Sequence, residues 1–266
     1  MRILALLFSL LAVPATAHEF WLEPTAYQIA ADGTLEAHIV NGQNFAGTNQ
    51  VFFPQRFEHF AIIAGGTGAS VRGRAGDRPA LNQAPVAQGL NVIAYQARNA
   101  TVDYATWEKF QNFVDHKDFG DVLTRQRERE LPESNFKEVY SRYSKTLIGV
   151  GSAAGTDHRV GLETELVALT NPYTDDLDNG FTVQLFYHQD VRANVQIEVF
   201  DKAPDGTVEV SYFQTNDEGI ATFPITGGNS YMVDAVMLRE PSDELQEQTG
   251  AVWETLWANL TFGTPE

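Results

Sequence analysis

Alternation of apolar and polar residues with a period of two is the feature of this sequence that most constrains its fold. In the segment 34–40, three apolar residues alternate with the polar residues Glu36 and His38. A strand with one buried face requires this pattern, because successive side chains point to opposite sides of a sheet. Similar runs recur at 57–64, 90–97, 163–169, 181–187, 195–200, 208–214, 220–224, 231–238 and 253–262. Many short strands separated by turn residues are typical of β-sandwiches.

One segment, about 104–140, breaks this period. Trp107, Phe110, Phe113 and Val114 recur at helical spacing, and a charged run follows at 125–130. This spacing predicts two or three short helices, because residues three and four apart share one side of a helix. His116 then falls at a predicted helix C-terminus, where a positive charge is favourable.

Local patterns give two further expectations in this part of the chain. Glu138, Arg142 and Lys145 are three to four residues apart, which on a helix would place them on one side as a ladder of ion pairs. His59 has the same strand phase as Phe57, which predicts a half-buried or core histidine.

A glycine- and alanine-rich stretch at 151–161 is the most linker-like segment and suggests a domain boundary. The predicted fold class is therefore mainly β, with two β-sandwich-like domains. Residues 18–155 form the N-terminal β-rich domain with its helical insertion at about 104–140. Residues 156–266 form a transthyretin-like or immunoglobulin-like sandwich, because Asp-Gly-type turns there separate about seven strand-like runs.

Residues 1–17 have the composition of a signal peptide. Arg2 provides the positive charge, residues 3–13 are apolar, and Ala15-Thr16-Ala17 matches a small-residue cleavage site. We expect export to the periplasm with cleavage after Ala17, and no membrane insertion after cleavage, since no later segment approaches about 20 apolar residues.

The charge balance narrows the classes of ligand. The chain has 18 Lys+Arg against 35 Asp+Glu, a formal net charge of −17, and no cysteine. This charge repels nucleic acid, so small cations are the expected partners. Without cysteine, a metal site must use histidine, carboxylate, amide or terminal amine groups.

Cleavage after Ala17 would leave His18 as the first mature residue. Its α-amine and its imidazole Nδ1 can then close one chelate ring on a metal ion. One further imidazole would give a three-nitrogen site suited to copper, and added oxygen ligands would suit nickel or cobalt. His38, on the polar side of its strand, and His188, in a polar turn at a strand end, are the preferred further ligands.

Several motifs resemble those of an exported bacterial family that is catalogued as a domain of unknown function. The motifs are His18–Pro24, Asn41–Gln43, Gly76–Ala80, Leu131-Pro132, Glu138–Lys145, Asn171–Tyr173 and Trp253–Phe262. Members are labelled periplasmic component of an ABC-type cobalt transport system, or nickel uptake family. The resemblance implies a metal-associated periplasmic protein with a transthyretin-like C-terminal part. The chain departs from the family pattern at His188–Val191 and at Gln126.

Together these features predict a non-catalytic periplasmic protein that binds nickel, cobalt or copper and assists metal uptake or handling. An inner-membrane metal permease is the expected protein partner. No nucleophile elbow, phosphate loop or zinc-protease motif is present. Two alternatives stay open: a copper-dependent oxidase resembling lytic polysaccharide monooxygenases, and a structural or interaction β-sandwich. The oxidase would need an exposed aromatic surface, whereas we expect Trp21, Trp253 and Trp257 to pack in the core.

Overall fold

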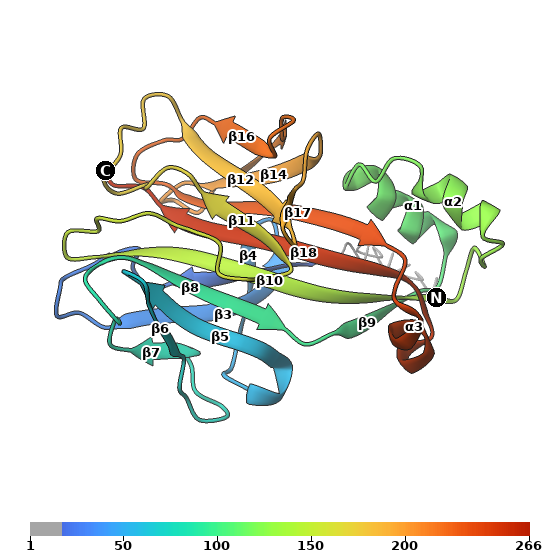
Figure 1. The fold of residues 1–266 in the computed structure, drawn as a ribbon, viewed down its shortest axis with the longest axis horizontal. Helices are drawn as coiled ribbons and strands as arrows, with labels where there is room; N and C mark the ends of the chain where they lie inside the picture. The colour runs from blue at the N-terminus through green and yellow to red at the C-terminus, as the bar shows by residue number, and fades with distance from the viewer. Residues whose placement is uncertain (1–17) are drawn as a thin grey trace, which may run out of the picture.

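The computed structural model describes residues 18–266, so the expected signal peptide lies outside the described part. The described chain forms three β-sheets with a few short helices at one end (Figure 1). The prediction of a mainly β fold is confirmed.

A ten-stranded central sheet extends through the whole molecule (Figure 1). Its strands in spatial order are β15 (Val208–Gln214), β14 (Gln196–Lys202), β17 (Ser230–Arg239), β18 (Ala251–Gly263), β10 (Phe136–Val150), β8 (Gly89–Ala97), β5 (Phe57–Ala64) and β6 (Thr67–Ser70). Two short strands, β2 (Gln28–Ile29) and β9 (Ala100–Tyr104), also pair with β10. In the middle of the sheet, β10 and β18 are parallel neighbours from Lys137 to Thr146.

Two four-stranded sheets cover parts of the central sheet. The N-terminal sheet contains β1 (Glu19–Pro24), β3 (Leu35–Gln43), β4 (Ala46–Gln50) and β7 (Leu81–Gln83). The C-terminal sheet contains β11 (Thr164–Ala168), β12 (Phe181–Tyr187), β13 (Asp190–Val191) and β16 (Ile220–Phe223).

The two covering sheets lie on opposite faces of the central sheet, as the alternation along β10 shows. Ile148 belongs to the apolar core with the N-terminal sheet, whereas Leu147 belongs to the core with the C-terminal sheet. We call the face that meets the N-terminal sheet the first face, and the opposite one the second face. Each face has its own apolar core, which is the arrangement expected of a strand buried on both sides.

The helical insertion also packs on the first face. It consists of α1 (Trp107–His116) and α2 (Val122–Glu128), and Phe110 and Phe113 of α1 pack with Trp253 and Trp257 of β18. Two further short helices are the 3₁₀ turn η1 (Pro54–Arg56) and α3 (Asp243–Thr249). None of the helices within residues 18–266 is long and apolar enough to cross a membrane.

The predicted ion-pair ladder on a helix is wrong, because Phe136–Val150 is strand β10. Alternation along this strand sends Glu138 and Arg142 to the first face and Lys145 to the second. The prediction for His59 is also wrong, since its side chain is exposed. A register shift between Phe57 and His59 in the β5–β8 pairing reverses the phase that the simple alternation assumed.

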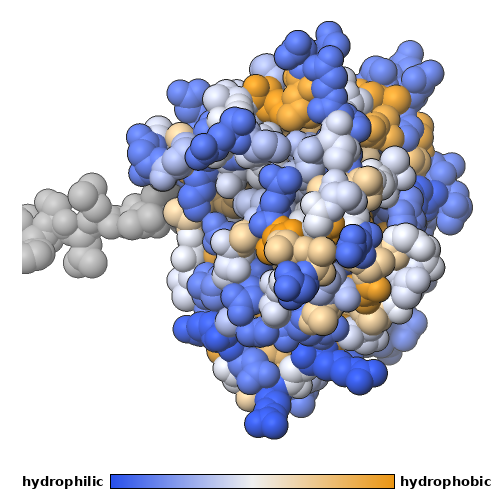
Figure 2. Space-filling model, turned by 90° about the vertical axis from the view of Figure 1, so that its left-hand side faces the viewer, coloured by the Kyte–Doolittle hydropathy of each residue, from blue (hydrophilic) through white to orange (hydrophobic). Residues whose placement is uncertain are grey.

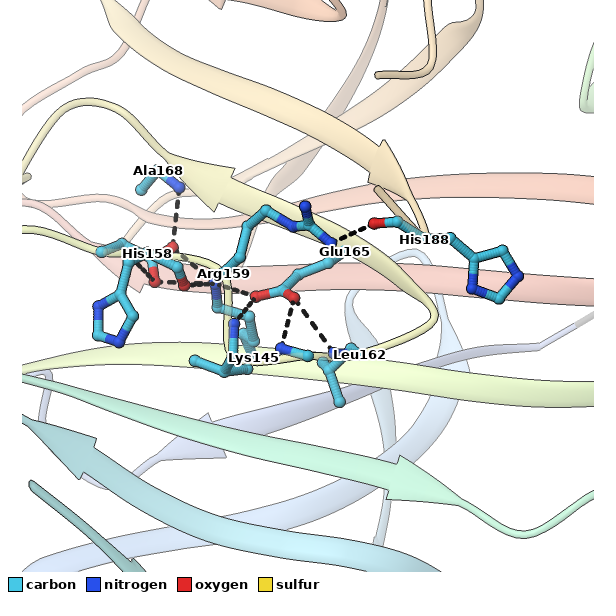
Figure 3. A network of polar contacts seen from close by, with 10 residues as sticks. Lys145, His158, Arg159, Leu162, Glu165, Ala168 and His188 are labelled. Carbon is cyan, nitrogen blue, oxygen red and sulfur yellow. Dashed lines mark hydrogen bonds and ion pairs between the residues drawn. The ribbon is translucent and has the colours of Figure 1, made fainter. Parts of the chain in front are cut away.

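On the second face, Lys145 anchors the loop between β10 and β11 (Figure 3). Its Nζ lies 2.8 Å from Asp157 Oδ1 and 3.0 Å from Glu165 Oε1, and all three side chains are buried. The two carboxylates also accept backbone N–H bonds from His158, Val160, Gly161, Leu162 and Ala168. The predicted domain boundary at 155/156 falls in this loop. It stays a prediction, while the central sheet itself contains strands from both sides of it.

The end of the molecule remote from α1 and α2 is mostly hydrophilic, with apolar residues gathered in separate patches (Figure 2). Two cavities lie elsewhere, on the first face of the central sheet near α1 and β9.

Candidate functional site

A cavity of about 350 Å³ lies on the first face between the end of the N-terminal sheet and helix α1. Its floor consists of residues from β10, β14, β15 and β18 of the central sheet. We call this space the acidic cavity. The residues on which its chemistry depends are His18, Glu19, Tyr104, His116, Lys117, Glu138, Tyr140, Arg142, Glu198, Tyr212 and Trp257.

The walls of the acidic cavity follow from local structure. The hairpin between β3 and β4 turns at Asn44 and Phe45, whose φ values are 52° and 56°. This turn directs the Asn44 N–H to Glu19 Oε2 at 2.8 Å, and thereby fixes the Glu19 carboxylate at the cavity wall. On the other side, α1 ends at His116, as predicted, and Lys117 follows directly.

Lys117 enters the protein interior and meets two carboxylates. Its Nζ lies 2.8 Å from Glu198 Oε1 and 3.1 Å from Asp234 Oδ2. Burial opposes the charge of this ammonium group, but Asp234 and Glu198 outweigh burial and raise the pKa of Lys117. His116 approaches the same carboxylate from the helix end, with its Nε2 3.2 Å from Glu198 Oε1. Lys117 is therefore a buried cation shared by two acids.

The interior of this site holds more acids than bases. Four buried carboxyl groups (Glu19, Glu138, Glu198 and Asp234) face the two cationic groups of Lys117 and Arg142. Burial, and then the nearby charge of Asp234, raise the pKa of Glu19 to about 7. Burial also raises the pKa of Glu138 to about 7, although hydrogen bonds from the Thr255 and Tyr104 hydroxyls oppose this shift.

Arg142 occupies an aromatic environment. Its guanidinium carbon lies 4.6 Å from the centre of the Tyr140 ring and 5.9 Å from that of Trp257. Its Nη2 donates to the backbone oxygen of His18 at 2.8 Å, whereas its Nε is buried and has no hydrogen-bond partner in the described part of the chain. Within residues 18–266 no salt bridge joins Arg142 to a carboxylate. Burial lowers its pKa.

The structure brings only one of the three predicted metal ligands to this cavity. His18 is exposed at its wall. His38 lies further along the same sheet, opposite Glu23 at the other end of the β1–β3 pairing. His188 follows β12 on the second face, where its Nε2 is 3.5 Å from Glu163 Oε1, and its ring points away from the Lys145 cluster (Figure 3). The three histidines are therefore separated.

Sequence reasoning ranked His116 low and missed most of the buried charges. A charged residue inside an otherwise apolar strand was the available signal: Glu198 and Asp234 both interrupt such runs. No group of three or more histidine, aspartate or glutamate side chains within residues 18–266 is arranged to hold a metal ion as it stands. Trp21, Trp253 and Trp257 are buried, which confirms their predicted core packing.

Comparisons with known proteins place the chain in a family. No curated protein matches the sequence. Among solved structures, the D0-D1 domain of intimin is similar over 92% of this chain and 98% of that chain, with 13% identity and a TM-score of 0.23. A tetra-tandem repeat from the extending region of a large adhesion protein is similar over 93% of this chain and 50% of that chain, with 11% identity and a TM-score of 0.20. The family model described as domain of unknown function (DUF4198) matches residues 15–239, so the chain belongs to this family.

Proposed function

We propose that this protein is an exported, non-catalytic transition-metal-binding protein whose site forms around His18 at the acidic cavity. The observation that carries the proposal is the position of His18 at the wall of a cavity that His116 and Glu198 also line. Nickel and cobalt are the metals that the family resemblance favours, and copper is the one that a nitrogen-rich donor set favours. Handing the ion to an inner-membrane permease would follow from a periplasmic location.

The chelating unit would come from processing of the chain. Cleavage after Ala17 frees the α-amine of His18, which can then join its own imidazole on one metal ion. An α-amine has a pKa near 8, about two units below that of a lysine side chain, so a metal displaces its proton at a smaller cost. Because His18 is exposed, both donors are accessible to an ion from solution.

The cavity interior supports a cation at this place. In this site, which is shielded from water, four buried carboxyl groups outnumber two cationic groups, and the excess becomes negative charge as Glu19 and Glu138, whose pKa values are raised to about 7, lose their protons. Charges interact more strongly in such a site than in bulk solvent. A divalent cation at the cavity wall would offset this excess.

His116, rather than His38 or His188, is the further ligand that we propose. Its side chain is 49% exposed and contacts Glu198 through Nε2, so a rotation about its side-chain bonds can direct the same nitrogen to an ion. Glu198 Oε2 has no hydrogen-bond partner among the residues that the structure describes and would supply an oxygen ligand. This rearrangement is required, because the described side chains do not form a closed metal site as they stand.

Metal titration of three forms of the purified protein tests the proposal. The mature protein beginning at His18 should bind one Cu(II) or Ni(II) ion. A form with one extra residue before His18, and the variant His18→Ala, should each bind at least tenfold more weakly, about 1.4 kcal/mol. His59→Ala serves as the matched control, because His59 is an exposed histidine on β5. Equal binding by all forms would contradict the N-terminal site.

A further inference from the structure

A second cavity, of about 420 Å³, shares Tyr140 and Arg142 with the acidic cavity. It lies on the first face near η1 and the loop from β8 to β9. Its other lining residues are Phe20, Ile39, Asn41, Gln50, Val51, Phe53, Gln55, Arg56, Tyr95, Ala97, Arg98, Asn99 and Ala100. We call it the basic cavity, because these residues include arginines and amides but no aspartate or glutamate.

This composition is opposite to that of the whole chain. The sequence has 35 acidic residues against 18 basic ones, yet Arg56, Arg98 and Arg142 meet in one cavity whose lining contains no acid. Arg98 donates its backbone N–H to the backbone oxygen of Arg56 at 2.9 Å, which keeps these two residues side by side. Three arginines that line one cavity produce a positive potential that attracts an anion.

Arg142 is the most deeply placed of the three and has unused donor capacity. One of its nitrogens binds the backbone oxygen of His18, and its Nε has no partner among residues 18–266. Arg142 is half-buried, and although the charges of Asp234 and Glu138 act on it from a distance, it forms no salt bridge with a counter-charge within residues 18–266. An anionic ligand would supply that counter-charge.

Arg56 and Arg98, the two exposed arginines at the rim of the basic cavity, make only weak interactions with other groups. Arg98 pairs with Glu58, but both side chains are about half exposed, at 50% and 47%, so this pair is weak. Arg56 lies over the ring of Phe53, with its guanidinium carbon 5.7 Å from the ring centre. The rings of Phe20, Phe53 and Tyr95 also give the cavity an apolar surface.

We propose that the basic cavity binds a small organic carboxylate, with its carboxylate group held by Arg142 and the two rim arginines and its carbon skeleton against the aromatic rings. Guanidinium groups match the geometry of a carboxylate through paired hydrogen bonds. The apolar surface favours an organic acid over an inorganic oxyanion, which has no apolar part. This site goes beyond the proposed metal site and does not require it.

Calorimetric titration of metal-free mature protein with benzoate, succinate and citrate, each against phosphate and sulfate, tests this proposal. At least one carboxylate should bind at least tenfold more tightly than either inorganic ion. Arg142→Gln should weaken that binding at least tenfold, and Arg56→Gln severalfold. Glu58→Gln should strengthen it, because Arg98 is then released from its pair. Arg72→Gln, which changes an exposed arginine outside both cavities, should leave the affinity within twofold.

Three results would overturn the proposal: no measurable carboxylate binding, equal binding of carboxylate and inorganic ions, or unchanged affinity in the arginine variants. If Arg142→Gln fails to fold, the double variant Arg56→Gln/Arg98→Gln decides the question, since both side chains are exposed. Because no metal is present in these titrations, loss of the metal site in His18→Ala and loss of carboxylate binding are separate outcomes.

Discussion

Buried charged groups lie on both sides of strand β10, but the two groups differ in how many of their polar atoms have partners. On the second face, every polar side-chain atom of Lys145, Asp157 and Glu165 has a partner within the protein. On the first face, three buried atoms have no hydrogen-bond partner within the described residues 18–266: Glu198 Oε2, Asp234 Oδ1 and Arg142 Nε. The polar network on the second face of β10 therefore has all its hydrogen-bond partners, whereas the network on the first face lacks some of them.

This difference separates a structural role from a binding role. A buried network with all its partners stabilises one conformation and offers nothing to a ligand. Buried groups that lack partners are costly in the unliganded protein, so a ligand that completes them gains the corresponding interactions. We therefore expect variants on the second face to change stability, and variants on the first face to change binding and pH dependence.

The largest effect should follow from Lys145→Met. This change leaves the Asp157 and Glu165 carboxylates buried without their cation, which should lower the free energy of unfolding by about 3–5 kcal/mol. Denaturant unfolding measures this loss. Lys137→Met is the control, because Lys137 lies on the same strand but is exposed. A loss below about 1 kcal/mol would contradict a structural role for the cluster.

Glu138→Gln should change the pH dependence of stability. Because burial raises the pKa of Glu138 from 4.5 to about 7, the folded protein keeps a proton that the unfolded chain releases between these pH values. The stability from this proton is complete below pH 4.5 and is lost as pH rises through about 7, a change of about 3 kcal/mol.

The glutamine variant should lack this loss, so it should gain stability over the wild type between pH 4 and pH 8. Unfolding by denaturant at both pH values measures the difference. Glu133→Gln, at a side chain that is 59% exposed, should follow the wild type at both. If the free energy of unfolding changed equally with pH in the wild type and in Glu138→Gln, the predicted rise in the pKa of Glu138 would be contradicted.

A smaller effect is expected for His116→Ala. If this histidine completes the site of His18, its removal should weaken metal binding about five- to tenfold, or about 1–1.4 kcal/mol. Metal titration under the same conditions as for His18→Ala measures the change. His38→Ala and His188→Ala should bind like the wild type. Weaker binding in either of these, with no change in His116→Ala, would restore the sequence-based choice of ligands.

The smallest effect should follow from His158→Ala. The backbone of His158 belongs to the Lys145 cluster, but its imidazole is exposed and points away from it (Figure 3). The free energy of unfolding should change by less than about 0.5 kcal/mol, and metal affinity should not change. A larger destabilisation in thermal or denaturant unfolding would mean that the cluster extends to this side chain.

The period-two pattern predicted the strands, and helical spacing predicted the insertion, because both patterns depend only on local burial. The period-two pattern failed where buried and exposed residues do not simply alternate along the strand. At His59 a register shift changes the phase, and from Glu138 to Lys145 charged residues lie on both sides of a central strand and imitate helical spacing. The acidic cavity joins Glu19, His116 and Glu198 from distant segments. Only the tertiary pairing brings them together, so local patterns carried no information about it.

The parallel pairing of β10 with β18 also determines at what stage of folding the central sheet can form. Ser144 and Asn259, which share a hydrogen bond across this pairing, are 115 residues apart in the chain. Contacts of such sequence separation form slowly, because a long loop must close first. Trp257, which forms part of the cavity floor, lies on that same late strand. The chain must therefore be synthesised beyond Trp257 before the binding region exists, and a chain lacking β18 would expose both halves of the central sheet to aggregation.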